Sequence, residues 1–171
     1  MEYVMKICLL GDANVGKTSL VYRFIENRFS TDFKSTLGVN LLKKKVKIND
    51  NDVSVQIWDL GGQEAYKKLR RLYLEGSQGA LVVFDKTSHT SFENLDDWVG
   101  SFKDSQKDAP IILIGNKIDL KDQITVTEKE AEEYAAKNNM EYISTSAKTG
   151  EQVEEAFKSL IKKIIDSQKN E

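Results

Sequence analysis

The sequence predicts an α/β fold in which helices cover both faces of a mostly parallel sheet. Short runs of aliphatic and β-branched residues alternate along the chain with longer segments whose apolar residues recur at helical spacing. Four of the short runs are almost continuously apolar, as expected of parallel strands that are buried on both faces. We therefore expect three layers, with one sheet between two layers of helices.

The six candidate strands follow from these short runs and from the turn residues that bound them. Two of them flank the run Asn49-Asp50-Asn51-Asp52, whose residues favour tight turns, so this pair is expected to form an antiparallel hairpin. The sheet should then have six strands, one of them antiparallel. The expected ranges are 3–10, 39–48, 53–58, 80–84, 111–115 and 141–144.

The segments between the strands predict amphipathic helices. A first helix places Leu20, Val21 and Phe24 on one face, and capping-box patterns that begin at Thr90, Thr127 and Thr149 predict the starts of three more. No repeat, linker or low-complexity tract interrupts the pattern, so we expect a single domain over residues 1–171.

Composition narrows the classes of partner. The chain is 40% hydrophobic and 30% charged, with a formal net charge of −2, so no overall field attracts nucleic acid. The only cysteine, Cys8, excludes an internal disulfide. We see no signal peptide, lipidation motif or membrane-spanning run. We expect a monomeric cytoplasmic protein, peripheral to a membrane only if a lipidated tail or a partner attaches it.

A phosphate-binding loop follows the first predicted strand. Residues 11–18 match G-x-x-x-x-G-K-[ST] between a strand and a helix. Backbone N–H groups of such a loop surround a phosphate, and the helix N-terminus adds a favourable dipole. Gly16 permits close approach, Lys17 supplies a cation, and the Thr18 hydroxyl can ligate magnesium. The expected nucleotide contacts are Asp12, Ala13, Asn14, Val15, Gly16, Lys17, Thr18 and Ser19. The loop alone leaves the base open, so adenylate-type kinases and ATPases remain candidates here.

Two further motifs follow the last two strands. Asn116-Lys117-Ile118-Asp119 comes after the strand 111–115, and Ser146-Ala147-Lys148 comes after 141–144. In these positions they resemble the guanine-recognition motifs of the Ras superfamily of small GTPases, and the resemblance covers essentially the whole chain. The Asp119 carboxylate can accept two parallel hydrogen bonds from guanine, and adenine offers neither donor in that arrangement.

The resemblance also implies roles around the base. Asn116 and Lys117 would brace the loops and cover the base, with Ser146 and Lys148 in the neighbouring motif. Ala147 would donate its backbone N–H to guanine O6, and Phe29 would place an aromatic edge against the base. The implied ligand is GTP or GDP with Mg²⁺.

The run Asp59-Leu60-Gly61-Gly62-Gln63 resembles the D-x-x-G-Q segment of the same superfamily. The resemblance implies that Asp59 holds magnesium through water, that Gly62 donates to the γ-phosphate and that Gln63 orients the attacking water. Upstream, Thr36 matches the residue that ligates magnesium and senses the γ-phosphate. The expected catalytic residues are Lys17, Thr36 and Gln63, and the expected magnesium ligands are Thr18, Thr36 and Asp59.

Within the superfamily the chain most resembles the Rab branch, for example in segments 37–40 and 146–150, whereas Gly61-Gly62-Gln63 is closer to Arf proteins. The resemblance implies a GTP hydrolase that switches with its nucleotide and regulates signalling or trafficking. Exchange factors, GTPase-activating proteins and effectors would contact residues 30–40 and 60–75. No arginine directly precedes Thr36, so we expect slow intrinsic turnover that a partner accelerates.

Two alternative functions belong to classes of protein other than GTP hydrolases. A guanine-nucleotide-binding module with little hydrolysis is left open by Asn14, which replaces a glycine common in the family, and by Gly61, whereas Gln63 argues against it. A phosphotransferase or ATPase would need a different base contact from the one that Asp119 offers. His89, the only histidine, is expected to lie in a loop and to have no catalytic role.

Overall fold

The computed structural model describes residues 2–29, 39–61 and 68–169, and over these residues it has a six-stranded sheet in the order β2-β3-β1-β4-β5-β6. β2 runs antiparallel to β3, and all other neighbours are parallel, which confirms the predicted sheet. The strands are β1 (Glu2–Leu10), β2 (Val39–Ile48), β3 (Asn51–Leu60), β4 (Gly79–Asp85), β5 (Ile111–Asn116) and β6 (Glu141–Ser144).

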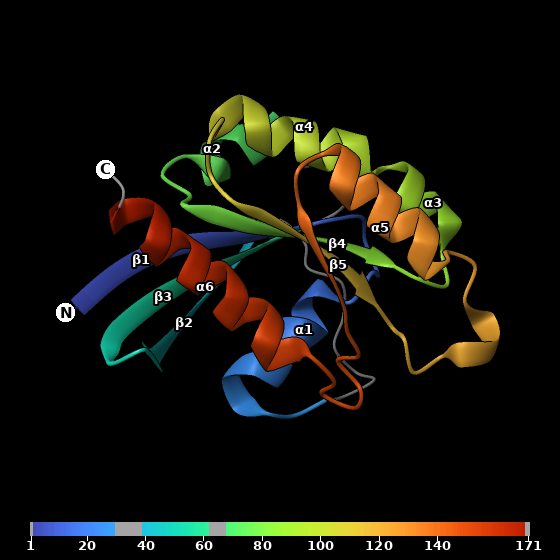
Figure 1. Ribbon diagram of the computed structural model, residues 1–171, viewed down its shortest axis with the longest axis horizontal. Helices are drawn as coiled ribbons and strands as arrows, with labels where there is room; N and C mark the ends of the chain where they lie inside the picture. Colours follow the sequence, from blue (N-terminus) through green and yellow to red (C-terminus); the bar gives the residue numbers. More distant parts are fainter. Residues whose placement is uncertain (1, 30–38, 62–67, 170–171) are drawn as a thin grey trace.

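Helices cover both faces of the sheet, as predicted. Figure 1 shows α1 and α6 on one face and α2, α3, α4 and α5 on the other. None of the described helices has the length and apolar content needed to cross a bilayer. The helices are α1 (Lys17–Glu26), α2 (Arg70–Leu74), α3 (His89–Glu93), α4 (Leu95–Ser105), α5 (Glu128–Lys137) and α6 (Val153–Lys169), with a short 3-10 helix at Lys121–Gln123.

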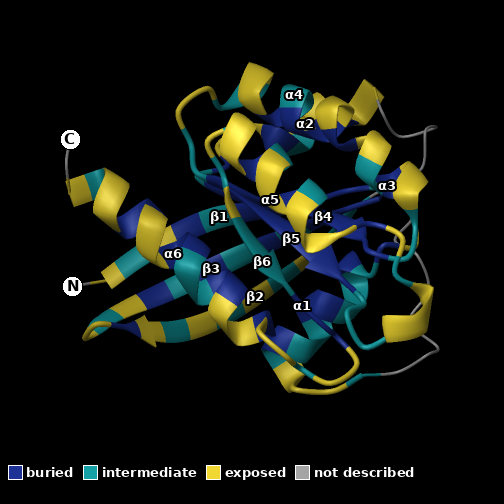
Figure 2. Ribbon diagram, turned by 45° about the vertical axis from the view of Figure 1, so that its right-hand side comes forward, coloured by how far each residue is buried: buried dark blue, intermediate teal, exposed yellow. Residues whose placement is uncertain are grey.

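Two separate hydrophobic clusters result from the alternation of side chains along the strands. In β1, Leu9 packs with α1 and α6, whereas the next residue, Leu10, packs with α4 and α5. The rings of Phe24 and Phe157 stack 4.2 Å apart in the first cluster, and Trp98 is buried in the second. Figure 2 shows the consequence, with buried residues along the strands and exposed residues on the outer helix faces.

The hairpin between β2 and β3 is tighter than the turn-rich run suggested. Only Asn49 and Asp50 form the turn, with φ values of 49° and 67°, while Asn51 and Asp52 already belong to β3. Two consecutive left-handed residues give a twist that matches the flanking strands, and Asn and Asp tolerate this conformation well.

Two of the three predicted capping boxes are wrong. Thr127 does cap α5, with reciprocal bonds to Glu130. α3, however, begins before Thr90: Ser88 adopts the extended conformation that an N-cap needs and accepts from the Ser91 N–H, so His89 starts the helix and does not lie in a loop. Thr149 accepts from the N–H of Glu151, and α6 begins only at Val153.

Candidate functional site

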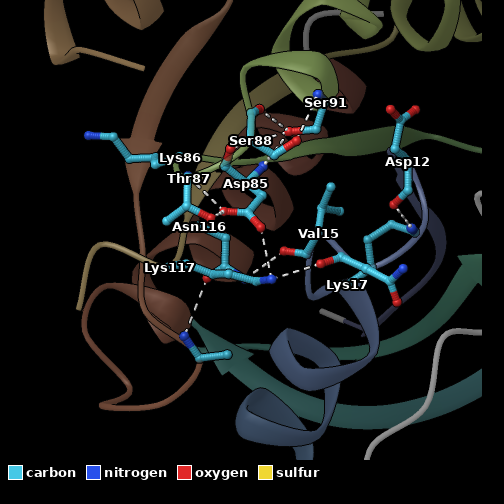
Figure 3. A network of polar contacts seen from close by, with 12 residues as sticks. Asp12, Val15, Lys17, Asp85, Lys86, Thr87, Ser88, Ser91, Asn116 and Lys117 are labelled. Atoms are coloured by element: carbon cyan, nitrogen blue, oxygen red, sulfur yellow. Dashed lines mark hydrogen bonds and ion pairs between the residues drawn. The ribbon is translucent and has the colours of Figure 1, made fainter. Parts of the chain in front are cut away.

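The candidate site lies at the edge of the sheet where the parallel strands β1, β4, β5 and β6 end, which is where ligands bind in open α/β sheets. Figure 3 shows the polar contacts that gather there. Lys17 begins α1 directly after the loop that follows β1, Asp85 ends β4, and Asn116 ends β5. Side chains far apart in the sequence are thus brought to one edge.

The loop of residues 11–18 comes into close contact with the motif that follows β5. Gly16 has a φ of 99° and forms the N-cap of α1. A Cβ at this position would lie 2.3 Å from Nδ2 of Asn116, a separation at which one of the two residues would have to move. Glycine therefore lets the predicted phosphate loop and the predicted base-binding loop pack directly against each other.

Lys17 is only 5% exposed, although its side chain ends in an ammonium group. Nζ donates to the carbonyl oxygens of Gly11, at 2.8 Å, and Asp12, at 3.0 Å. Burial lowers the pKa of Lys17 from 10.5 to about 8, although the carboxylates of Asp59 and Asp12 oppose the change. A buried cation that is held mainly by carbonyl groups favours an anionic ligand, and a phosphate chain over the loop fits this requirement.

Thr18 and Asp59 lie together beside Lys17. The Thr18 hydroxyl donates to Oδ2 of Asp59 at 2.6 Å, and Asp59 is fully buried at the end of β3. A hydroxyl oxygen and a carboxylate oxygen from two elements are hard ligands of the kind that Mg²⁺ prefers. The residues present therefore fit a magnesium ion next to a bound phosphate.

Asn116 joins three parts of the site. Its Nδ2 donates to the carbonyl of Val15 at 3.0 Å, and its Oδ1 accepts from the Thr145 hydroxyl at 3.0 Å and from the Ala147 N–H at 3.3 Å. The side chain is 1% exposed. Because the loops after β1 and β6 both bond to this one amide at the end of β5, the relative positions of the three strand ends are fixed together.

Lys117 makes a second link between the loops. Its Nζ donates to the carbonyl of Asn14 at 2.8 Å and pairs with Oδ2 of Asp85, also at 2.8 Å. The aliphatic part of this side chain runs close to Gly16. Asp85 is held in turn by the backbone N–H and the hydroxyl of Thr87.

Asp119 and the residues after β6 form the other end of the site. The Ser146 hydroxyl donates to Oδ1 of Asp119 at 2.7 Å, which orients the carboxylate. Arg23 of α1 donates to the carbonyls of Ala147, at 2.8 Å, and Lys148, at 2.5 Å. The contribution of Arg23 is not predictable from the motifs, since no local pattern marks a bond between residues so far apart.

The Asp12 carboxylate makes contacts that the sequence motif did not predict. Oδ2 accepts from Nδ2 of Asn94 at 2.6 Å, and Oδ1 accepts from Nε1 of Trp98 at 2.8 Å. The side chain of this loop residue is therefore bonded to α4 and the residue before it. A motif read along the chain identifies the loop, but not the helix to which the loop is attached.

The remaining predicted site residues do not take part in the contacts described above. Ala13, within the loop, and Ser19, in the first turn of α1, are both half-buried. Phe29 packs, partly buried, against the cluster beneath α1 and α6. Thr36, Gly62 and Gln63 lie outside the described residues, so their predicted roles stay predictions.

The fold and the site together define a class of protein. It is a phosphate-loop nucleotide-binding protein in which the loops after β5 and β6 carry the guanine-type motifs. Residues 6–166 match the Ras family, and the chain belongs to this family. It is thus a small GTPase, a GTP hydrolase that acts as a GTP/GDP-dependent switch, as predicted.

Relatives in three organisms place the chain near the Rab branch, which also agrees with the prediction. It is 38% identical to the GTP-binding protein ypt3 of Schizosaccharomyces pombe over 96% of this chain and 77% of the relative. It is 37% identical to the Ras-related protein rab-11.1 of Caenorhabditis elegans over 99% and 81%. It is 36% identical to the Ras-related protein RABA1c of Arabidopsis thaliana over 95% and 76%.

Proposed function

We propose that this edge of the sheet binds GTP or GDP with magnesium, with the phosphates on residues 12–19 and the guanine against Asp119. The observation that carries the proposal is the Asn116 amide at the end of β5, which bonds to the loops after β1 and β6. A ligand that reaches both Lys17 and Asp119 would match the lysine with an anionic end and the carboxylate with hydrogen-bond donors. A guanine nucleotide has both.

Magnesium would be held by Thr18, Asp59 and Thr36, together with phosphate oxygens. The proposal is supported by the contact between the Thr18 hydroxyl and the Asp59 carboxylate. When bound, the ion neutralises charge that develops on the phosphate oxygens. Lys17 contributes a second positive charge at the same place, and the surrounding protein keeps it out of water.

Asp119 would select guanine, with Ser146, Ala147, Lys148 and Phe29 completing the base site. The test is Asp119→Asn with GTP and with xanthosine triphosphate, in which a carbonyl replaces the exocyclic amino group. The Asn side chain can accept from N1–H and donate to that carbonyl. We expect weaker GTP binding and stronger XTP binding, since a lost or unmatched hydrogen bond at a buried polar site costs affinity. Unchanged preference would refute the assignment of Asp119.

Gln63 would orient the attacking water, with Lys17 and Thr36 as the other catalytic residues. The test is single-turnover hydrolysis of GTP with magnesium by the wild type and by Gln63→Leu. We expect slow hydrolysis by the wild type and slower hydrolysis by the variant, with GTP still bound by both. Equal rates in the two proteins would contradict the role of Gln63, and fast hydrolysis without any partner would contradict the expected slow turnover.

Partner proteins would read the nucleotide state through residues 30–40 and 60–75, in a Rab-like signalling or trafficking role. The exposed leucines next to or within these segments support the proposal: Leu69 is 41% exposed and Leu72 is 64% exposed on the second, and Leu41 is 44% exposed just after the first. Exchange factors, activating proteins and effectors are the proposed partners.

The protein is proposed to be a cytoplasmic monomer with one domain over residues 1–171. It would be peripheral to a membrane only through a lipidated tail or a partner.

A further inference from the structure

Arg70 is a buried cation at the start of α2, inside the segment proposed to switch with the nucleotide. It is 6% exposed, whereas its neighbours Lys68, Leu69 and Arg71 are exposed. A buried guanidinium is costly unless its charge and its donors are matched. The partners of Arg70 therefore show what holds this end of α2 in position.

The described hydrogen bonds and the ring contact of Arg70 all lie on α4. Nη1 donates to Oδ2 of Asp97 at 3.1 Å and to the Ser101 hydroxyl at 3.0 Å. The guanidinium carbon lies 3.6 Å from the centre of the Trp98 ring, a close cation–π contact. The other buried residue of α2, Leu74, lies at the opposite end of the helix. Arg70 is thus the anchor of the end that is joined to the segment carrying Gln63.

Trp98 contacts both Arg70 and the phosphate loop. The ring that lies beneath Arg70 donates its Nε1–H to Oδ1 of Asp12 at 2.8 Å. The backbone carbonyl of Asp12 in turn accepts from Nζ of Lys17 at 3.0 Å. Continuous contacts therefore run from α2, through one buried indole, to the lysine of the phosphate loop.

We infer that Arg70 is a positioning residue for GTP hydrolysis, which acts through Trp98 to hold α2 in a fixed relation to the phosphate loop. The inference rests on the proposed binding of GTP to that loop. Hydrolysis needs the phosphates and the residue that orients water to be aligned together, and small misplacements reduce rates strongly. Arg70 therefore acts on this alignment through α2 and Trp98, the contacts described above.

Arg70→Gln tests the inference, with Arg71→Gln as a matched control, because Arg71 is the exposed neighbour on the same helix and the charge change is identical. The measurements are the single-turnover hydrolysis rate, the GTP dissociation rate and the melting temperature. We expect Arg70→Gln to lower the hydrolysis rate about tenfold and to change GTP dissociation by less than about twofold. Because the assays contain no partner protein that could contact this segment, Arg71→Gln should leave both rates unchanged.

Trp98→Phe tests the link to the loop, because phenylalanine keeps an aromatic face for Arg70 but has no N–H for Asp12. We expect this variant also to hydrolyse GTP more slowly, and the double variant with Arg70→Gln to be no slower than the slower single variant. Should Arg70→Gln fail to fold, Arg70→Lys keeps the charge, loses the forked contacts and should still slow hydrolysis.

Different failures point to different errors. A wild-type protein that does not bind GTP would overturn the proposed function itself. Hydrolysis by Arg70→Gln at the wild-type rate, or the same loss in Arg71→Gln, would overturn only the inference about Arg70. A lower melting temperature with unchanged single-turnover hydrolysis would assign Arg70 a purely structural role. This result would also overturn the inference. Fully additive losses in the double variant would show that Arg70 does not act through Trp98.

Discussion

Replacing Gly11 by alanine should destabilise the protein more than any other single methyl addition at a described glycine of this site. Gly11 directly follows β1 and has a φ of 146°, which side chains rarely adopt. An added Cβ would lie 2.2 Å from the carbonyl oxygen of Val83, a backbone atom of the central strand β4. No rotamer change can relieve this contact, so β1 and β4 would have to separate locally.

The size of the effect follows from two costs. Holding alanine in a rarely populated backbone conformation costs about 1–3 kcal/mol. Forcing extra volume into a close-packed interior costs about 1–3 kcal/mol more. We therefore expect Gly11→Ala to lower the free energy of unfolding by roughly 2–6 kcal/mol. Since a domain has only about 5–15 kcal/mol in total, this loss is a large fraction of the stability.

Urea titration followed by circular dichroism measures this loss, and Gly100→Ala provides the control. Gly100 lies inside α4, and nothing lies within 4 Å of a Cβ built there. The same substitution should therefore raise the free energy of unfolding by about 0.5–1 kcal/mol. A loss at Gly11 below about 1 kcal/mol, or an equal loss at Gly100, would refute the reasoning from the Val83 contact.

Three further predictions concern single side chains. His89 pairs with Glu93 and Glu130, and the hydrogen bonds to these carboxylates raise the pKa of His89. NMR titration of this one histidine should show a pKa above 6.5. Glu130→Gln should lower the pKa of His89. These pairs stabilise the fold below the ordinary histidine pKa, and the stabilisation is lost as the pH rises through the raised pKa. Burial raises the pKa of Cys8 to about 11, so a thiol reagent at pH 8 should react with the folded protein far more slowly than with protein unfolded in urea. Asn116→Ala removes three hydrogen bonds, so the free energy of unfolding should fall by roughly 3 kcal/mol and bound GDP should dissociate faster, as fluorescent-nucleotide release would show.

The fold was largely predictable because its signals are local. The apolar strand runs predicted every described strand to within two residues at either end, and the run from Asn49 predicted the one hairpin. The two wrong capping predictions, at Thr90 and Thr149, also have local causes. Ser88 rather than Thr90 is the N-cap of α3, and Gln152 adopts a positive φ of 57° directly before α6. Cap patterns alone do not decide such competition.

The loops of the candidate site were predictable from the sequence, but the long-range hydrogen bonds that hold these loops in place were not. The motifs around Lys17 and Asn116 are contiguous, and the carboxyl ends of parallel strands must meet at one edge, so their proximity follows from the sequence. The bonds of Arg23 to the Ala147 carbonyl and of Trp98 to Asp12 span about half of the chain or more. Such contacts depend on tertiary packing, which no pattern of neighbouring residues encodes.

The alternation of side chains along β1, with Leu9 facing one cluster and Leu10 the other, also separates the two helical layers energetically. Side chains on opposite faces do not share a cavity, so their substitutions should be close to additive, whereas those on one face should compensate for each other. The layer of α1 and α6 and the layer of α2, α4 and α5 can therefore diverge in sequence at different rates, as two proteins sharing a single sheet would. The layer that carries α2 can accumulate changes suited to new partners without repacking the layer of α1 and α6.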